Sequence, residues 1–327
     1  MNNLKKSEVK NLDKKYLDRI KDVSFKPVFI LGFHRSGTSI LYKMIQSTGK
    51  FNSVTTYHVL KYNRLIHNHV KGLEQQIKEE LNRYFADKDR GIDRLDMNAD
   101  LPLEYAFLIN GGYLFSSLTE KNFDVFLEMC KKIQYVDGRD KKLLLKNPWD
   151  FSNFLFIKKH LPEAKFVFIH RHPLPVMNSS MKALRVLAEE ETVYSDIISP
   201  IAKKLRRNPI LSVFADCLLF RYFPLALILI VEHHAKDSRR FVKNIRHLDK
   251  SDYVNIKYEE LCEKPAETMG RIVNLLDLEE DNLERFNEFI EPRDLSISKD
   301  VKMMEGYIMK RMKSYCRFLG YSKEKVD

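Results

Sequence analysis

The residues best suited to bind an anionic group form one short segment, Gly32–Ser39, with the sequence GFHRSGTS. Its glycines have the G-x-x-x-x-G spacing of a phosphate-binding turn, in which successive backbone N–H groups converge at a helix N-terminus. Thr38 stands where the Walker motif places lysine, and an ordinary ATPase needs that lysine to reach the β- and γ-phosphates. Arg35 supplies a cation instead, and its planar guanidinium offers a fork of donors to an oxyanion.

Arg171 and Ser179 form a second pair that could hold a phosphate. Arg171 directly follows the apolar run 165–170, and Ser179 comes eight residues later, where a helix is predicted. An arginine at the carboxyl edge of a strand and a hydroxyl in the first turns of the next helix can contact one phosphate. Taken alone, the pair could equally be a surface arginine and a helix cap.

Lys146 and Tyr258 also follow apolar runs that are typical of strands. Lys146 ends the run 142–146 before an Asn-Pro pair, and Tyr258 follows the run 253–257. Taken alone, Lys146 would be a lysine that ends a strand at the solvent. Tyr258 would be a tyrosine that packs at the edge of a sheet.

The elements that must position these residues alternate between strands and helices. Short apolar runs predict buried parallel strands, and the segments between them show helical spacing. Strands that alternate with helices imply right-handed βαβ units. We therefore predict an α/β fold, with a P-loop-type parallel sheet flanked by helices. The predicted strands are 27–32, 142–146, 165–170 and 253–257, and the predicted helices are 37–48, 60–90, 150–160, 174–190 and 266–277.

The length and composition are those of a globular protein. The chain has 327 residues, of which 44% are hydrophobic and 31% charged, enough for one large domain. We predict a basic N-terminal arm over 1–24 and a single domain over 25–327, with a helical insertion at about 185–245. The run Tyr222–Val231 has no charged residue, but it is about half as long as a membrane span needs to be. We predict no transmembrane span.

The charge and the cysteines exclude several classes of protein. A net charge of +11 favours anionic partners such as nucleotide phosphates. The positive charge is spread along the chain without a nucleic-acid motif, so we predict no nucleic-acid partner. Four widely spaced cysteines without a C-x-x-C pair indicate neither a zinc site nor a disulfide framework. The polar N-terminus lacks the apolar core of a signal peptide, and we predict a cytoplasmic protein. The sequence indicates no oligomeric state.

The segment 27–45, PVFILGFHRSGTSILYKMI, resembles the 5′-phosphosulfate-binding segment of the sulfotransferases that use PAPS (3′-phosphoadenosine-5′-phosphosulfate). It is most similar to the branch with arginine in the loop, which includes protein-tyrosine sulfotransferases and many bacterial relatives. The companion motifs of the family follow in the expected order. They are an L-K-x-P segment, a strand ending in arginine with a serine eight residues later, and a Y-E-x-L…P segment.

The resemblance implies a function and a role for each matched residue. The function is transfer of a sulfuryl group from PAPS to a hydroxyl or amine by in-line displacement, with release of PAP. No metal is required, because sulfate esters carry less charge than phosphates. Arg171 and Ser179 would hold the 3′-phosphate, and Tyr258 would contact the nucleotide. Lys146 and Arg35 would stabilise the transferring group as catalytic cations. The 5′-phosphosulfate would lie on Arg35, Ser36, Gly37, Thr38 and Ser39.

Two residues are candidates for the base that takes the acceptor proton. The tyrosine-sulfotransferase branch uses a glutamate about twenty residues past the loop arginine, whereas the cytosolic enzymes use histidine. This sequence has no Asp or Glu between Ser39 and Glu74, but it has His58, and a histidine can accept a proton near neutral pH. Glu104 lies in an L-P-x-E element that resembles one of the bacterial branch. His58 is our first choice as the base. Glu104 is the alternative, either as the base or as a residue that orients the acceptor or the base. His34 and His172 are expected to flank the donor.

Two regions depart from the family or carry no usable resemblance. The glycine-rich C-terminal loop of the cytosolic enzymes is absent, and candidates for a second 3′-phosphate clamp come from position only. The run Leu211–Val231 is either part of an apolar acceptor pocket or a core helix. The acceptor could be a small molecule, lipid, glycan or peptide. The clamp candidates are Ser296, Ser298, Lys299 and Lys302, and the aromatic residues of the apolar region are Phe214, Phe220, Tyr222 and Phe223.

Two other classes of function compete with sulfuryl transfer. A P-loop kinase of a small metabolite would need the Walker lysine and an aspartate that ends an apolar strand, and neither is visible. A non-catalytic nucleotide-binding protein would need only the glycine turn and a basic surface.

Overall fold

A parallel five-stranded sheet forms the centre of the protein, with the strand order β2-β3-β1-β4-β5. The strands are β1 Pro27–Leu31, β2 Phe51–Ser53, β3 Lys142–Lys146, β4 Lys165–His170 and β5 Tyr253–Lys257. The predicted α/β fold with a parallel sheet is confirmed. The computed structural model describes residues 11–86, 96–109, 116–189, 225–290 and 296–321.

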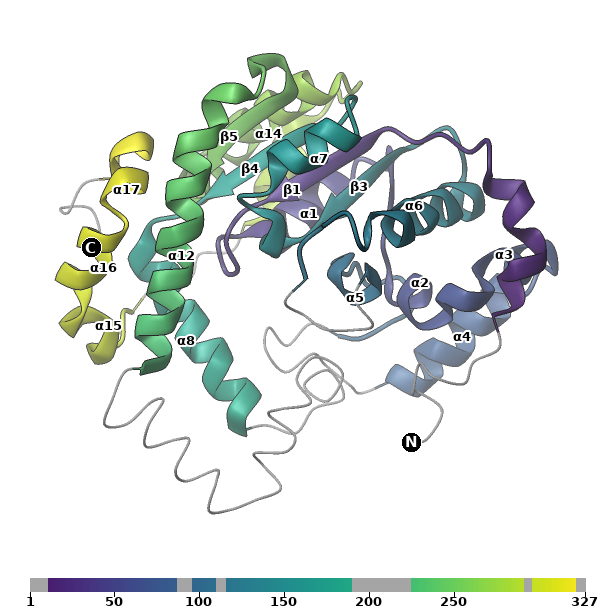
Figure 1. The fold of residues 1–327 in the computed structure, drawn as a ribbon, viewed down its shortest axis with the longest axis horizontal. Helices are drawn as coiled ribbons and strands as arrows, with labels where there is room; N and C mark the ends of the chain where they lie inside the picture. The colour runs from purple at the N-terminus through teal and green to yellow at the C-terminus, as the bar shows by residue number, and fades with distance from the viewer. Residues whose placement is uncertain (1–10, 87–95, 110–115, 190–224, 291–295, 322–327) are drawn as a thin grey trace.

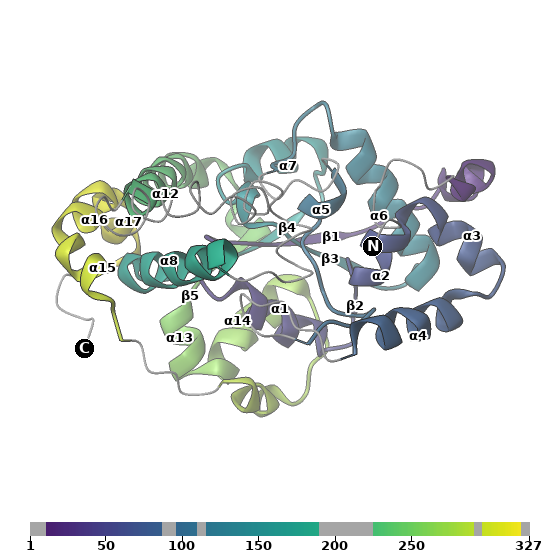
Figure 2. The same cartoon turned by 90° about the horizontal axis from the view of Figure 1, so that it is seen from below.

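Helices cover both faces of the sheet, as Figures 1 and 2 show. The helices are α1 Thr38–Gln46, α2 Thr56–Lys61, α3 Leu65–Val70, α4 Glu74–Phe85, α5 Ala106–Ile109, α6 Phe123–Asp137, α7 Phe154–His160, α8 Pro173–Glu189, α12 Leu225–Asn244, α13 Tyr258–Glu263, α14 Pro265–Leu276, α15 Lys299–Met303, α16 Glu305–Arg311 and α17 Lys313–Leu319. Short 3₁₀ helices lie at η2 Leu12–Ile20, η3 Tyr62–Arg64, η4 Pro148–Asp150, η6 Ile245–His247, η7 Lys250–Asp252 and η8 Leu283–Phe289.

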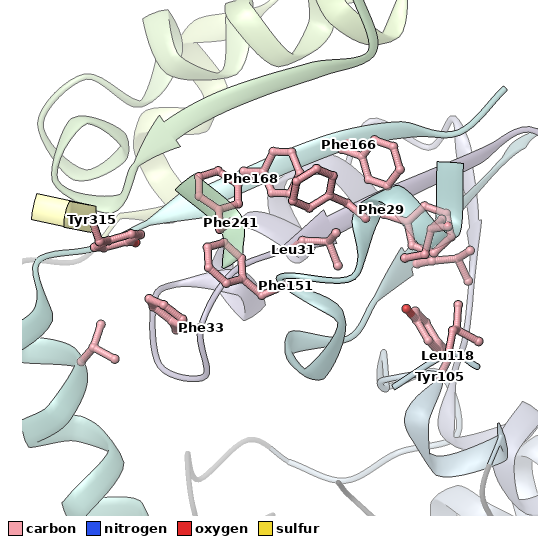
Figure 3. Packing of buried hydrophobic residues seen from close by; sticks show 14 of the residues in the cluster. Phe29, Leu31, Phe33, Tyr105, Leu118, Phe151, Phe166, Phe168, Phe241 and Tyr315 are labelled. Carbon is pink, nitrogen blue, oxygen red and sulfur yellow. The ribbon is translucent and has the colours of Figure 1, made fainter. Parts of the chain in front are cut away.

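The three central strands β3, β1 and β4 are buried on both faces because each face packs against its own layer of helices. On one face, Phe29, Phe166 and Phe168 join a large cluster with residues of α6, α7 and α12, and Figure 3 shows these rings beside Phe151 and Phe241. On the other face, alternate strand residues join α1, α13 and α14. This is why the strands read as continuous apolar runs rather than alternating ones.

The predicted strands are confirmed, but the sequence did not predict β2. That strand has only three residues, Phe51–Ser53, and its polar side chains are buried through specific bonds. The amide of Asn52 donates to the Gly138 carbonyl oxygen at 2.6 Å, and Gln46 donates to the Ser53 hydroxyl at 3.0 Å. Such bonds to other elements leave no mark in a local apolar pattern.

The helical region predicted over 60–90 consists of several short elements. η3, α3 and α4 follow one another there, and Gly72 lies between α3 and α4 with a φ of 66°. Few residues other than glycine adopt this left-handed conformation, so Gly72 interrupts the helical run.

The described part of the predicted N-terminal arm packs against α3 and α6. Asp13 of η2 is fully buried and pairs with the buried Lys132 of α6 at 3.0 Å. Asp13 also accepts a hydrogen bond from the backbone N–H of His67 at 2.9 Å. An ion pair without solvent exposure needs such additional bonds to offset its desolvation.

The predicted insertion at about 185–245 contains the end of α8 and the whole of α12. Ala226, Leu227 and Val231 of α12 are buried, whereas Leu229 is 58% exposed. The aromatic residues proposed for an acceptor pocket, Phe214, Phe220, Tyr222 and Phe223, lie outside the described residues. None of the described helices combines the length and apolar character that a membrane span requires.

Candidate active site

The glycine turn connects β1 to α1 and lies tightly against neighbouring elements. A Cβ atom at Gly32 would lie 2.4 Å from the Ile169 carbonyl oxygen, and one at Gly37 would lie 2.3 Å from the Tyr258 ring. Gly37 caps α1 with a φ of 100°, and Arg35 adopts a left-handed φ of 68°. The first N–H groups of α1 have no carbonyl partner within the helix. The turn therefore presents a helix N-terminus that suits an anion.

Ser36 shapes the turn from within. Its side chain is fully buried, and its hydroxyl donates to the Phe33 carbonyl oxygen at 2.7 Å. Its backbone N–H donates to the same oxygen at 3.1 Å. Both donor groups of this residue therefore stabilise the loop itself.

Arg35, Ser179, Arg171 and Tyr258 meet beside the turn. The Nε of Arg35 donates to the Ser179 hydroxyl at 2.9 Å, and Nη1 of Arg171 donates to the Arg35 carbonyl oxygen at 3.0 Å. The Arg171 guanidinium also lies 4.1 Å from the centre of the Tyr258 ring. The Nε of Arg171 is buried and lacks a hydrogen-bond partner among the residues that the structure describes. Two cations thus converge here, and an anionic ligand could accept a hydrogen bond from Nε of Arg171.

The carboxyl end of β4 is held from two sides, which fixes Arg171. His170 lies between Asn255 Oδ1 at 2.9 Å and the Tyr315 hydroxyl at 3.1 Å. Burial lowers the pKa of His170 to about 4, so at neutral pH the neutral ring donates to Asn255 and accepts from Tyr315. On the other side of Arg171, the backbone N–H of His172 donates to the Glu259 carboxylate at 2.9 Å.

Lys146 and Glu104 form a second charged group at the same edge of the sheet. Lys146 ends β3 and is buried. Its Nζ donates to the Ser39 hydroxyl at 3.2 Å and lies 3.5 Å from Oε1 of Glu104. The other carboxylate oxygen of Glu104 is buried and has no hydrogen-bond partner in the described part of the chain. A carboxylate and an ammonium therefore lie together beside the helix N-terminus.

The comparisons with known proteins identify the family. The model of the sulfotransferase family matches residues 27–282. The chain belongs to this family. The resemblance of the loop and its companion motifs to the sulfotransferases is confirmed. The alternative of a P-loop kinase is not confirmed.

Solved sulfotransferases share the fold at low sequence identity. Sulfotransferase STF9 from Mycobacterium avium superposes with a TM-score of 0.63 at 14% identity, over 93% of this chain and 80% of that chain. STF1 from Mycobacterium tuberculosis H37Rv gives a TM-score of 0.57, also at 14% identity and over 93% and 80% of the two chains. At this identity the likeness shows the fold alone. None of the curated proteins matches the sequence.

The two candidate bases of this sulfotransferase lie in different surroundings. Glu104 contacts Lys146 next to the turn. His58 is buried in α2, where its Nδ1 accepts the backbone N–H of Thr55 at 3.1 Å and closes a capping box. Its Nε2 lies 3.4 Å from Asp137. None of these contacts connects His58 to the turn or to Lys146.

His34 and His172 both flank the turn or the end of β4. The ring of His34 packs against Trp149 with ring centres 4.4 Å apart. Burial, opposed by the charge of Glu104, lowers the pKa of His34 to about 4. The imidazole is therefore neutral at neutral pH. The ring of His172 packs edge-on against Tyr321, with ring centres 5.4 Å apart.

The segment with the clamp candidates is attached to α8 beside Ser179. The side chain of Asn178 donates to the Ser296 carbonyl oxygen at 3.0 Å and accepts the backbone N–H of Ser298 at 3.0 Å. Lys299 and Lys302 follow on α15, and both are exposed. The structure thus brings the segment to the helix that carries Ser179, while the clamp itself stays a prediction.

Proposed function

We propose that this sulfotransferase moves the sulfuryl group of PAPS to a hydroxyl or amine acceptor by in-line displacement and releases PAP. The observation that carries the proposal is the meeting of Arg35, Arg171, Ser179 and Tyr258 beside a helix N-terminus. These residues come from separate segments of the chain. Two guanidinium groups, one hydroxyl and one aromatic ring suit a nucleotide with several oxyanions.

The donor groups divide between the two ends of PAPS. The turn and the N-terminus of α1, with Thr38 and Ser39, hold the 5′-phosphosulfate. Arg171 and Ser179 hold the 3′-phosphate. The buried Nε–H of Arg171 has no hydrogen-bond acceptor among the described residues, so it can donate to this phosphate. Tyr258, whose ring centre lies 4.1 Å from the Arg171 guanidinium, contacts the nucleotide. The fit rests on oxyanion chemistry, because a guanidinium fork binds phosphate oxygens well.

Lys146 and Glu104 carry the transfer step. Glu104 accepts the proton of the acceptor as the acceptor atom bonds to sulfur. In the same step the bond between sulfur and the bridging oxygen of the donor breaks, and PAP leaves with that oxygen. Lys146, Arg35 and the N-terminus of α1 stabilise the charge that develops on the bridging and equatorial oxygens.

Glu104 serves as the base in this proposal, rather than His58. Its carboxylate lies 3.5 Å from the Lys146 ammonium, and one of its oxygens has no partner among the described residues. A base must reach the proton that it removes. The His58 ring instead uses Nδ1 to cap α2 and faces Asp137 with Nε2.

Thermal melting in the presence of three ligands tests the donor. A ligand that binds only the folded state at about 100 times its Kd stabilises the fold by about 2.7 kcal/mol. We expect PAP to raise the Tm by several degrees, ATP with Mg²⁺ to raise it far less, and a DNA oligonucleotide to leave it unchanged. A larger shift with ATP and Mg²⁺ than with PAP would refute a PAPS site. Release of PAP from PAPS with panels of hydroxyl and amine acceptors then tests transfer.

A further inference from the structure

Asp150 is a buried carboxylate that no motif of the sequence singled out. It lies at the end of η4, has no exposed surface, and accepts four hydrogen bonds. Oδ2 accepts from the Tyr105 hydroxyl at 2.6 Å and from the Asn147 amide at 2.8 Å. Oδ1 accepts from the backbone N–H of Leu118 at 2.9 Å and from the Asn153 amide at 2.7 Å.

Two of these donors are the direct neighbours of the proposed catalytic pair. Tyr105 follows Glu104, and Asn147 follows Lys146. The two segments also touch directly, because the backbone N–H of Tyr105 donates to the Lys146 carbonyl oxygen at 3.3 Å. The carboxylate of Asp150 therefore closes a ring of bonds whose other side is the contact between Glu104 and Lys146.

The closed network of bonds around Asp150 is rigid because its members have further contacts. The Asn147 amide also donates to the Ser116 carbonyl oxygen at 2.8 Å. Tyr105 is fully buried and packs in the same hydrophobic cluster as Leu118 (Figure 3). Its ring lies edge-on against Phe126, with ring centres 5.1 Å apart. Neither Tyr105 nor Asn147 can shift without breaking several of these contacts.

The chemistry of the network requires a carboxylate. Four N–H or O–H donors point at two oxygens, and only an ionised carboxylate accepts at all four positions. An amide at position 150 would direct its own N–H groups toward two of these donors. Burial raises the pKa of Asp150, and the hydrogen bonds from Tyr105, Asn153, Leu118 and Asn147 oppose that effect. A buried charge is costly unless it is fully hydrogen-bonded, and this one is.

We infer that Asp150 is a positioning residue that sets the Lys146 ammonium and the Glu104 carboxylate against the transferring sulfuryl group. The inference rests on the proposed function of the same site. Asp150 itself does not contact PAPS. It acts through Tyr105 and Asn147, and through them it fixes where Lys146 and Glu104 lie.

The test is the ratio of the affinities for PAPS and PAP, which needs no acceptor. Only PAPS carries the sulfuryl group that Lys146 would contact. A displaced Lys146 should therefore lower the affinity for PAPS and leave the affinity for PAP unchanged. We expect Tyr105→Phe, which keeps the ring and removes one bond, to lower the affinity for PAPS by roughly five- to tenfold. The slow release of PAP from PAPS with water as the acceptor should fall by roughly 10- to 100-fold. Asp150→Asn should exceed both effects if it folds.

A matched control separates positioning from stability. The hydroxyl of Tyr307 on α16 donates to the carboxylate of Glu232 on α12 at 2.6 Å, the same type of bond as that between Tyr105 and Asp150. Tyr307→Phe should lower the Tm without changing the ratio of PAPS to PAP affinity. A Tyr105→Phe protein that keeps the parent ratio and the parent rate of PAP release would overturn the inference. A parent protein that does not bind PAP would instead overturn the proposed function, so the two failures are distinguishable.

Discussion

Arg171→Ala removes a guanidinium that stabilises the protein and, in the proposed site, binds the 3′-phosphate. The guanidinium donates to the Arg35 carbonyl oxygen at 3.0 Å and lies 4.1 Å from the centre of the Tyr258 ring. The hydrogen bond contributes about 1 kcal/mol and the cation–π contact about 0.5–2 kcal/mol. We therefore expect the free energy of unfolding to fall by about 1.5–3 kcal/mol, which urea titration measures.

The loss of ligand affinity is a separate quantity. A hydrogen bond to a charged group contributes about 1.5–3 kcal/mol, which corresponds to roughly a 10- to 150-fold change in Kd. PAP carries the 3′-phosphate and AMP does not, so calorimetric titration with both nucleotides isolates the contact. Arg171→Ala should bind PAP more weakly by that factor and AMP as the parent does. The salt concentration must be fixed, because exposed charges are screened.

A second arginine serves as the control. Arg271 also donates to a backbone carbonyl oxygen, that of Asn255, and pairs with Glu260 at 3.0 Å. Arg271→Ala removes a similar contact without a role in the proposed site, and PAP affinity should be unchanged. If Arg171→Ala loses stability as expected but binds PAP like the parent, Arg171 is a structural residue and the 3′-phosphate assignment is wrong.

Three further predictions follow from the same contacts. Glu104→Gln should keep the affinity for PAP and lower turnover by roughly two to four orders of magnitude. His58→Ala should lower the Tm and keep the turnover per folded molecule. If His58→Ala loses turnover and Glu104→Gln keeps it, His58 is the base. Gly37→Ala places a Cβ atom 2.3 Å from the Tyr258 ring at a φ of 100°, so it should lower the Tm and abolish the Tm shift with PAP. Burial lowers the pKa of His170 in the folded protein to about 4. In the unfolded chain the same imidazole has an ordinary pKa of about 6.5 and therefore takes up a proton at a higher pH. Stability is therefore lost as the pH falls from about 6.5 toward 4, by about 2 kcal/mol at pH 5, and urea titration of His170→Asn should show a shallower loss.

The sequence predicted where the proposed donor-binding residues lie better than it predicted where Glu104 lies. Arg171 and Tyr258 each follow a short run that is typical of a buried strand, and the carboxyl ends of parallel strands meet at one edge. Their positions relative to the turn therefore follow from the βαβ pattern. Glu104 lies in no such run. It reaches Lys146 through a bridge between Thr55 and Pro102 and a backbone bond from Tyr105, and long-range contacts of this kind have no local signature.

His58 illustrates the reverse case. Its residue type and its spacing from the loop arginine made it a candidate base, and the same position is the third residue of a helix that begins after Thr55. A side chain there can bond back to the cap residue. The capping signal, a threonine three residues before a side chain with an acceptor, was present in the sequence. It competes with the catalytic interpretation, and the contacts in the structure favour capping.

The order of the strands explains how motifs scattered along the chain could serve one extended donor. Along the chain the motifs follow β1, β3, β4 and β5, but across the sheet the order is β3, β1, β4 and β5. Lys146 therefore lies at one end, the glycine turn next to it, Arg171 beyond the turn and Tyr258 at the other end. Neighbouring strands are about 4.8 Å apart, so the row spans about 14 Å. In the proposed site, a donor with its sulfuryl group at Lys146, its 3′-phosphate at Arg171 and its nucleotide at Tyr258 would span this row from β3 to β5. In this proposal the acceptor would approach from the side of β2, where the Glu104 carboxylate has one oxygen without a partner among the described residues.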